Sequence, residues 1–409
     1  MRWSFIKGIL LLLFCLNTAL SAGEWSAELR RMGMENIREA DREEACYLSW
    51  EDPVYRGSCR GLAEVIRRVA QKSVEAKDFC FILQENRIPQ ILVRIPGEEL
   101  ERYRLQQGSW EELVRSAEIT YDTDEAVRIL KGSGKTAHTS AGRVDVVLYP
   151  QLNLRNAWLD KIYGASVNIA PAVEVALWKG AYFTGQVIFP IWNNLEGEAD
   201  YIRAGMVTLR QDIRLPKRWF ASVSVGNFDR QRIGADARLE WRTADDRWKM
   251  GIRGGLTGAS VFYGGKWKVS RWERFTGAAS VRYYEPTYNL EMELTGERYI
   301  YGDYGGRIDL TRHFGEVSIG LFAMYSGGEA NGGFSFSVPM PRKKRYRRGY
   351  FRVRLPEYWG LGYEAQSGNE YTERRLGRRY ETRPEESRSA GFYNPDFVRE
   401  ELIRYSVEK

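Results

Sequence analysis

Polar and apolar residues alternate without a break from position 232 to position 242. Arg232, Asp236 and Arg242 belong to the polar set, while Ile233 and Trp241 open and close the apolar set. A period of two places such sets on opposite faces of a β-strand. Apart from Gly234 in the polar set, the pattern predicts a strand with one charged face and one apolar face.

The same two-sided pattern recurs in the segments that begin near positions 248, 288 and 303. These runs are about ten residues or longer, whereas strands of soluble sandwiches are typically about five or six residues long. A tilted strand needs about ten residues to cross a bilayer. We therefore expect an all-β transmembrane barrel of about twelve antiparallel strands, with apolar residues outside and a wet lumen. The expected strands lie near 143–153, 162–177, 180–190, 200–213, 218–227, 231–242, 246–257, 274–284, 288–298, 303–312, 316–326 and 331–339.

Two sets of candidate site residues follow from this pattern. The connections at 215–217, 244–246, 285–287 and 313–315 are tight and fall on one side of the barrel, whereas 258–271 is long and falls on the other. We expect the long connection to face the cell exterior, although residues 260–268 could themselves pair as a strand. Aromatic residues of this outer loop could stack on sugar rings: Tyr263, Trp267 and Trp272. The candidate lumen-lining residues are Arg232, Asp236, Arg238, Glu240, Arg242, Arg247, Lys249, Arg253, Glu291, Glu293, Arg307 and Asp309.

The rest of the chain divides by composition. Residues 1–22 have the basic start, apolar run and small residues of a secretory signal peptide. No other stretch approaches about 18 apolar residues, so we expect no transmembrane helix. The predicted layout is a signal peptide (1–22), an N-terminal α+β periplasmic domain (23–130), a linker (131–141), an outer-membrane barrel (142–340) and a basic periplasmic tail (341–409).

The small N-terminal domain has its own element pattern. We expect a charged helix over 27–44, strands near 46–50, 79–84 and 89–94, an amphipathic helix over 61–72, and a short helix that starts at Ser109. The mature chain keeps Cys46, Cys59 and Cys80, which could form one disulfide or remain buried thiols. With two histidines in the whole chain, we expect no metal site and no cofactor.

The tail holds 17 Lys and Arg against 11 Asp and Glu and opens with a run of basic residues at 342–348. Behind a signal peptide such a run does not indicate nucleic acid. We interpret it as a solvated tail or as a basic surface for acidic glycans, lipid head groups or a partner protein. Its deletion from residue 342 onward is expected to leave the barrel folded.

Several stretches resemble the YjbH/GfcD family of outer-membrane proteins, which are encoded with exopolysaccharide and capsule systems. The resemblance covers roughly residues 140–340 and rests on strand and turn patterns: 205–211 with Arg214-Leu215-Pro216, 223–228 with Arg232 and Gly234, 255–258 with Tyr263, Trp267 and Ser270, and 332–339. It implies an outer-membrane protein that takes part in exopolysaccharide or capsule assembly and export. Its expected partners are outer-membrane lipid, polysaccharide, and periplasmic or outer-membrane export proteins.

Other interpretations of the same residues stay open. The lumen charges could be ion pairs that fill a narrow barrel, and Trp219, Trp241 and Trp248 fit membrane-interface anchors. A structural or scaffolding barrel that recruits periplasmic partners is the alternative function. We do not expect an enzyme, because neither histidine is placed to activate a nucleophile and Glu291 and Glu293 fit an ion-pair row. Reversing Arg238 and Arg253 to Glu is expected to preserve folding and to impair polysaccharide display.

Overall fold

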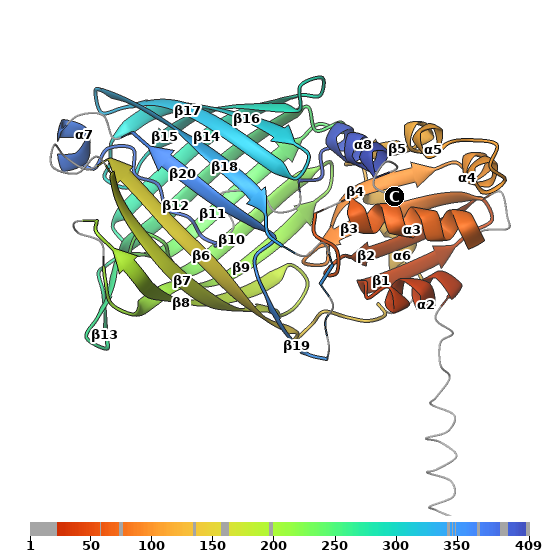
Figure 1. Cartoon of the computed structure of the whole chain (residues 1–409), viewed down its shortest axis with the longest axis horizontal. Helices are drawn as coiled ribbons and strands as arrows, with labels where there is room; N and C mark the ends of the chain where they lie inside the picture. Colours follow the sequence, from red (N-terminus) through yellow and green to blue (C-terminus); the bar gives the residue numbers. More distant parts are fainter. Residues whose placement is uncertain are drawn as a thin grey trace, which may run out of the picture.

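The structure is a computed structural model with two parts. Figure 1 shows a small N-terminal domain beside a large sheet whose strands wrap around a common interior. The predicted signal peptide lies outside the described residues. These are 23–57, 59–72, 77–133, 136–156, 163–195, 199–341, 344–345, 347, 349–365, 369–384 and 392–405.

The N-terminal domain is a five-stranded sheet with strand order β1-β2-β3-β4-β5. β2 and β3 are parallel and joined through helix α3, and the other neighbouring strands are antiparallel. Its elements are α2 (Glu24–Arg31), β1 (Glu35–Asp41), β2 (Ala45–Glu51), α3 (Arg60–Lys72), β3 (Asp78–Glu85), β4 (Ile88–Ile95), α4 (Gly97–Arg104), α5 (Trp110–Ser116), β5 (Glu118–Thr120) and α6 (Asp124–Lys131).

The apolar stripe of α3 packs against this sheet. Leu62 and Ile66 of the helix are fully buried in the same cluster as Leu48 of β2 and Phe81 of β3. Spacing of three and four residues puts apolar side chains on one helix face, which explains why this helix was predictable from its sequence. The expected helix over 27–44 is wrong, because its second half forms β1 and pairs with β2. The three cysteines are buried free thiols.

The large sheet is antiparallel along nearly its whole path. Each of the twelve strands expected from alternation is present within a few residues of its expected bounds. They are β6 (Val144–Asn156), β7 (Tyr163–Ala176), β8 (Ala181–Asn193), β9 (Arg203–Leu215), β10 (Trp219–Phe228), β11 (Arg232–Arg242), β12 (Trp248–Tyr263), β14 (Arg274–Glu285), β15 (Leu290–Arg298), β16 (Tyr304–Phe314), β17 (Val317–Ser326) and β18 (Glu329–Pro339).

Three further strands join this sheet. β13 (Lys266–Val269) pairs with the end of β12, so the open question about residues 260–268 resolves to a hairpin. β19 (Phe351–Arg354) pairs in parallel with the start of β6, and β20 (Tyr358–Glu364) pairs with β18. The hydrogen-bonded path therefore begins at β19 and ends at β20. β20 comes close to β6, but no ladder joins the described residues of these two strands.

The segment predicted as a basic tail is part of the fold. After β20 the chain reaches α7 (Asn369–Glu373) at the end of the sheet farthest from the N-terminal domain. It then returns, and α8 (Pro395–Arg404) packs on the N-terminal domain. There Val398 and Leu402 join the domain core, and Trp110 Nε1 donates a hydrogen bond to the Leu402 carbonyl at 2.7 Å. The prediction of a separate tail from 341 onward is wrong, because apolar residues far along the chain anchor it.

Among the described residues, no helix is both long enough and apolar enough to span a membrane.

Candidate functional site

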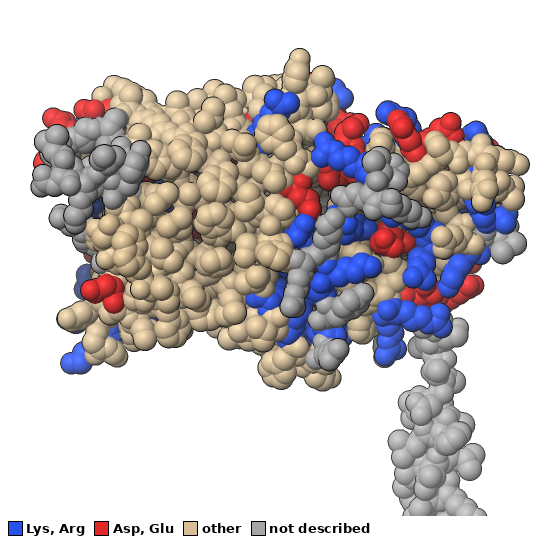
Figure 2. All heavy atoms as spheres, in the orientation of Figure 1, with Lys and Arg blue, Asp and Glu red and all other residues tan. Residues whose placement is uncertain are grey.

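The large sheet exposes its apolar face and buries its polar face. Leu321 of β17 and Ile252 of β12 are each 59% exposed, while Asp236 of β11 is 2% exposed. Figure 2 shows the same inversion: the visible side of the sheet is nearly free of charged side chains, and the N-terminal domain carries both signs. A fold in water shows the opposite arrangement. The polar interior and its junction with the N-terminal domain therefore form the candidate site.

Asp236 is the centre of one interior cluster. Its carboxylate accepts hydrogen bonds from Arg253 Nε at 2.7 Å, Arg238 Nε at 3.2 Å and Tyr380 Oη at 2.8 Å. The register explains the arrangement, because Arg238 of β11 lies directly opposite Arg253 of β12. Their like charges are compatible only because the Asp236 carboxylate contacts both of them. Of the candidate lumen residues, the structure brings these three together.

A second group lies nearer the N-terminal domain. Glu240 contacts Arg242 Nη2 at 3.0 Å and Lys249 Nζ at 3.2 Å. Arg242 also donates to the hydroxyl of Tyr121 at 2.9 Å, and Tyr121 belongs to the N-terminal domain. This group therefore links the interior of the sheet to the domain that packs against it.

The remaining lumen candidates divide between the interior and its edge. Glu291 contacts Arg282 Nη1 at 2.8 Å and His313 Nε2 at 2.5 Å, two residues that the sequence reasoning did not assign to the lumen. Arg307 and Asp309 pair at 2.6 Å. In the register, Glu293 lies opposite Arg282 and Asp309.

The two outermost basic candidates differ in placement. Arg232 is buried, and its Nη2 donates to the Thr257 hydroxyl at 2.9 Å. Arg247 lies in the turn before β12, partly exposed, and its Nε contacts Asp396 at 3.4 Å. Its contact with Asp396 of α8 places Arg247 at the end of the sheet next to the N-terminal domain, outside the interior.

The outer-loop candidates lie around the β12–β13 hairpin. Tyr263, Trp267 and Trp272 are all exposed. Trp267 donates its Nε1 hydrogen to the Ser260 hydroxyl at 2.8 Å, and Tyr263 packs edge-on against Tyr201 with ring centroids 5.2 Å apart. The hairpin projects from the end of the sheet opposite the N-terminal domain, as the sequence predicted for the long connection.

Sequence reasoning missed the segment that runs through the interior after α7. Tyr380 stacks on Phe228 at 5.3 Å between centroids, and the Arg253 guanidinium lies 4.7 Å from the Tyr380 ring centroid. Arg379 contacts Glu297 at 2.5 Å. Arg383 lies 3.9 Å from Glu85 of the N-terminal domain. Residues 376–384 therefore lie inside the polar interior and contact the inner face of the sheet. In the sequence, the charged residues between Arg374 and Arg383 could have indicated such a segment.

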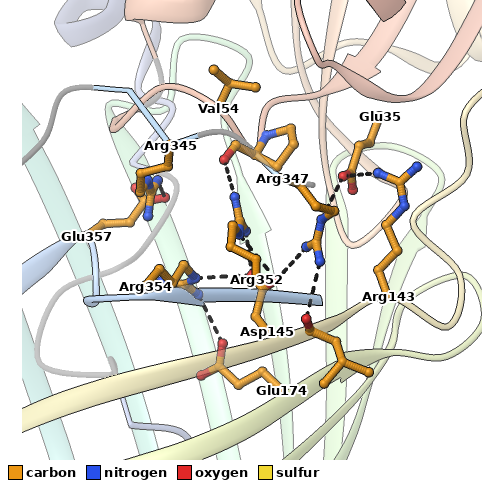
Figure 3. A network of polar contacts seen from close by, with 12 residues as sticks. Glu35, Val54, Arg143, Asp145, Glu174, Arg345, Arg347, Arg352, Arg354 and Glu357 are labelled. Atoms are coloured by element: carbon orange, nitrogen blue, oxygen red, sulfur yellow. Dashed lines mark hydrogen bonds and ion pairs between the residues drawn. The ribbon is translucent and has the colours of Figure 1, made fainter. Parts of the chain in front are cut away.

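A dense ion-pair cluster holds β19 to the start of the sheet (Figure 3). Asp145 of β6 contacts Arg347 at 2.5 Å and Arg354 at 3.1 Å, and it also pairs with Arg352. Arg354 reaches Glu174 of β7 at 3.0 Å. The buried carboxylate of Asp145 thus contacts three guanidinium groups, and Glu174 supplies a second negative charge beside it. Within the basic run at 342–348, Arg347 belongs to this cluster and Arg345 pairs with Glu357, so these two charges are structural ion pairs.

The same cluster extends into the N-terminal domain. Glu35 of β1 contacts Arg347 Nε at 3.2 Å and also pairs with Arg143, and Arg352 Nη1 donates to the Pro53 carbonyl at 2.5 Å. Beside it lies a cavity of ≈ 260 Å³ between the ends of β2 and β3, the inner wall of β6–β9 and the C-terminal segment.

Three buried carboxyl groups of the N-terminal domain line this cavity: Glu51, Asp52 and Glu85. Burial raises the pKa of Glu51 to about 6 and the pKa values of Asp52 and Glu85 to about 7 each. The physical cause is the loss of water around the charged form. With such pKa values the three carboxyl groups change protonation near neutral pH. The sequence alone did not indicate that these residues lie together.

No cluster of His, Cys, Asp and Glu within the described residues has a geometry that could hold a metal ion. The site is therefore described by its ion pairs, its aromatic residues and its cavity.

These features define a mostly β protein in which a large antiparallel sheet turns its apolar face outward and its polar face inward, beside a small α+β domain. The chain belongs to the family described as exopolysaccharide biosynthesis protein YbjH, which matches residues 17–340. This confirms the resemblance seen in the sequence and extends it through the N-terminal domain. Residues 341–409, which contain β19, β20 and the interior segment, lie outside the match. No curated protein matches the chain.

Proposed function

We propose that the chain is an outer-membrane β-barrel that takes part in exopolysaccharide or capsule assembly and export. Family membership supports the exopolysaccharide part of this proposal. The inverted sheet is the single observation that carries the membrane part. An apolar outer face suits the hydrocarbon core of a bilayer, where no water is present to solvate polar groups. The polar side chains of the inner face are satisfied by the ion pairs between them.

Strand length and aromatic placement support the same proposal. The twelve alternating strands have 9 to 16 residues, enough for a tilted strand to cross the hydrocarbon core. Trp219 and Trp248 are exposed at strand ends near the N-terminal domain, and Tyr304 and Tyr325 are exposed at the opposite ends. Two aromatic belts at these positions are typical of membrane–water interfaces.

In this proposal the N-terminal domain and α8 are periplasmic and the β12–β13 hairpin faces the cell exterior. Full closure of the barrel requires β6 and β20 to act as neighbours. Its partners are outer-membrane lipid, the polysaccharide, and export proteins that dock in the periplasm. We assign no catalytic step, because the interior carboxylates Asp236, Glu240 and Glu291 are held in ion pairs with basic residues.

The experiment combines location with function. Cells that lack the protein are complemented with the full chain, and outer-membrane fractions and surface polysaccharide are measured together. The proposal requires a band in the outer-membrane fraction that migrates differently with and without heating, and restored polysaccharide on the surface. Recovery of the chain in the soluble periplasmic fraction, or unchanged polysaccharide without it, would contradict the proposal.

The interior segment favours a second candidate function. Because residues 376–384 occupy the polar interior and α8 packs on the N-terminal domain, the protein could act as a scaffold through its periplasmic parts. A chain that ends at residue 365 separates the two functions. An export channel keeps polysaccharide display after this truncation, whereas a scaffold that acts through α8 loses it.

A further inference from the structure

The cavity at the junction lies where three parts of the protein meet. Glu51 ends β2 and Asp52 follows it, and Glu85 ends β3. Thr184 and Thr208 lie on the inner wall of the sheet, and the C-terminal segment closes the remaining side. A pocket in which a few polar groups and pKa-shifted residues converge is the first place to look for a ligand. At ≈ 260 Å³ the cavity is just below the usual range for small-molecule sites of about 300 Å³ or more, so it suits one small unit.

Four of the arginines around the cavity are held in ion pairs. Arg143 and Arg347 pair with Glu35, and Arg352 and Arg354 pair with Asp145. Counted over the whole lining, nine Asp and Glu residues face six Arg residues. Three of these carboxyl groups, Glu51, Asp52 and Glu85, take up protons near neutral pH, so the lining carries no excess of positive charge that would attract an anionic ligand such as a phosphate or a uronate.

The three carboxyl groups with raised pKa values, Glu51, Asp52 and Glu85, are suited to hydroxyl groups. Glu51 accepts hydrogen bonds from Asn36 Nδ2 at 2.6 Å and from the Asn86 amide at 3.1 Å. Asp52 uses Oδ1 to accept the Val54 and Tyr55 amides at 2.9 Å each, and its buried Oδ2 has no partner among the described residues. A carboxyl that is protonated near neutral pH both donates and accepts, which is also what a hydroxyl does.

The aromatic lining supplies the second property that a sugar requires. Trp50 is 0% exposed, it lines the cavity, and its Nε1 hydrogen has no acceptor among the described residues. Because Trp50 is fully packed, it contributes apolar wall to the cavity. Tyr182 and Tyr393 add further apolar surface to the lining.

We propose that this cavity binds one uncharged, hydroxyl-rich sugar unit, so that the N-terminal domain contacts the polysaccharide where it meets the sheet interior. The ligand class rests on the proposed function, and the site rests on the cavity, its carboxyl groups and its aromatic lining. Hydroxyls of the sugar pair with Glu85, and its apolar ring faces pack on the aromatic residues.

The test uses the full chain in detergent micelles and saturation-transfer difference NMR with three probes: glucose, glucosamine and glucuronate. We expect transfer to glucose, with affinity at least tenfold weaker for glucuronate. Glu85→Ala should weaken glucose binding at least tenfold, and the matched control Glu118→Ala, an exposed carboxylate of β5 remote from the cavity, should leave it unchanged. A second variant, Thr208→Phe, fills the cavity from the sheet side and should abolish the signal.

The outcomes separate cleanly. No transfer to any probe, equal transfer to glucuronate, stronger transfer to the glucosamine cation, or glucose binding that survives both variants would overturn the sugar site. Heat-dependent gel migration of each variant, recorded on the same samples, shows whether the sheet is folded. A chain that is folded, located in the outer membrane and required for display, but that binds no sugar, contradicts this inference while the proposed function stands. Glucose binding by a chain that is not in the outer membrane would support the sugar site and contradict the proposed function.

Discussion

The N-terminal domain and the large sheet obey opposite rules of burial within one chain. In the domain, Leu48 and Phe81 are fully buried and charged residues face outward. In the sheet, Leu321 faces outward and Asp236 faces inward. Alternation alone does not tell these cases apart, because a half-buried strand has the same period of two in water and in lipid. Length separates them: β2, β3 and β4 have 7 or 8 residues, and most strands of the large sheet have 10 or more.

The comparison also shows how each part satisfies its polar groups. Away from the junction the domain leaves charged side chains such as Glu98 and Glu111 to water, while the sheet pairs its charged side chains internally around Asp236, Asp145 and Glu291. A buried charge without a partner is expensive, so these carboxylates determine which strands and segments can lie together. The segment at 376–384 extends this network, since it brings its own arginines and tyrosine to the interior carboxylates.

The largest expected effect comes from two truncations that sharpen the boundary of the sheet. Ending the chain at residue 341 removes β19 and β20, whereas ending it at 365 keeps both strands. The shorter chain should lose the folded, heat-modifiable band on cold gels, because β18 and β6 lose their ladder partners. The longer chain should keep that band. This replaces the sequence-based expectation that deletion from 342 onward leaves the fold intact, and a folded band from the shorter chain would show that expectation to be right.

Next in size is the removal of an interior carboxylate. Asp236→Ala deprives Arg253, Arg238 and Tyr380 of their common acceptor. Breaking a buried pair by removing one partner costs about 3–5 kcal/mol. The control is Asp122→Ala, which removes an exposed contact to Arg218 worth at most about 1 kcal/mol. Denaturant titration of refolded protein in lipid, followed by tryptophan fluorescence, measures both. Equal costs would mean that the Asp236 cluster is as well solvated as the surface.

The same geometry revises the expected effect of charge reversal. Changing Arg238 and Arg253 to Glu would place three carboxylates together around position 236. Folding should therefore suffer along with polysaccharide display, and the double reversal does not isolate transport. The truncation at 365 is the better test of transport, because it removes the interior segment and keeps the strand residues.

A pair of matched arginine substitutions compares the outer faces of the two parts. Leu321 of the sheet and Leu105 after α4 are similarly exposed, at 59% and 49%. In lipid, Leu321→Arg should cost about 2–4 kcal/mol, the cost of a cation near the bilayer midplane. Leu105→Arg lies on a surface in water and should change the free energy of unfolding by at most about 0.5 kcal/mol. Similar costs for the two substitutions in lipid would contradict a membrane-facing sheet.

The smallest expected effect per residue is the pH dependence of the N-terminal domain. Glu51, Asp52 and Glu85 have raised pKa values in the folded state, at about 6, 7 and 7. The folded state then binds more protons than the unfolded state, so stability is greatest at low pH and falls as pH rises through 6 to 7. We expect a loss between pH 5 and pH 7 of roughly 1 kcal/mol for Glu51 and roughly 2 kcal/mol for each of Asp52 and Glu85.

Glu85→Gln should flatten this dependence, because an amide does not titrate. Denaturant titration of the domain at the two pH values, with Glu118→Gln as the control, measures it. Stability that rises between pH 5 and pH 7 in both variants would show that these carboxyl groups are ionised in the folded protein.

Most of the sheet was predictable because its signal is local. The alternation at 232–242 reports one strand without reference to any other, and the strand observed is β11 at Arg232–Arg242. The amphipathic helix α3 was found for the same reason. Neighbouring strands such as β11 and β12 could then be ordered by their short turns.

The features that were missed depend on distant contacts. Residues 35–41 are charged enough to suggest a helix, yet they form β1 because β2 offers a ladder. Tyr380 has no periodic pattern around it, and its position follows from Asp236 and Phe228 far earlier in the chain. The cavity at Glu51, Asp52 and Glu85 likewise arises from the packing of two domains and a returning segment. Local patterns in a single sequence do not indicate such contacts between distant segments.

The central claim is that the apolar face of the large sheet lies against lipid. The test attaches a nitroxide to a single cysteine added at position 321, after Cys46, Cys59 and Cys80 have been replaced by serine or alanine. The protein is refolded into vesicles, and the collision rates of the nitroxide with oxygen and with a water-soluble nickel chelate are measured. The account predicts high oxygen and low nickel accessibility at 321, with the reverse at the control position 105. High nickel accessibility at position 321 in folded protein would contradict it.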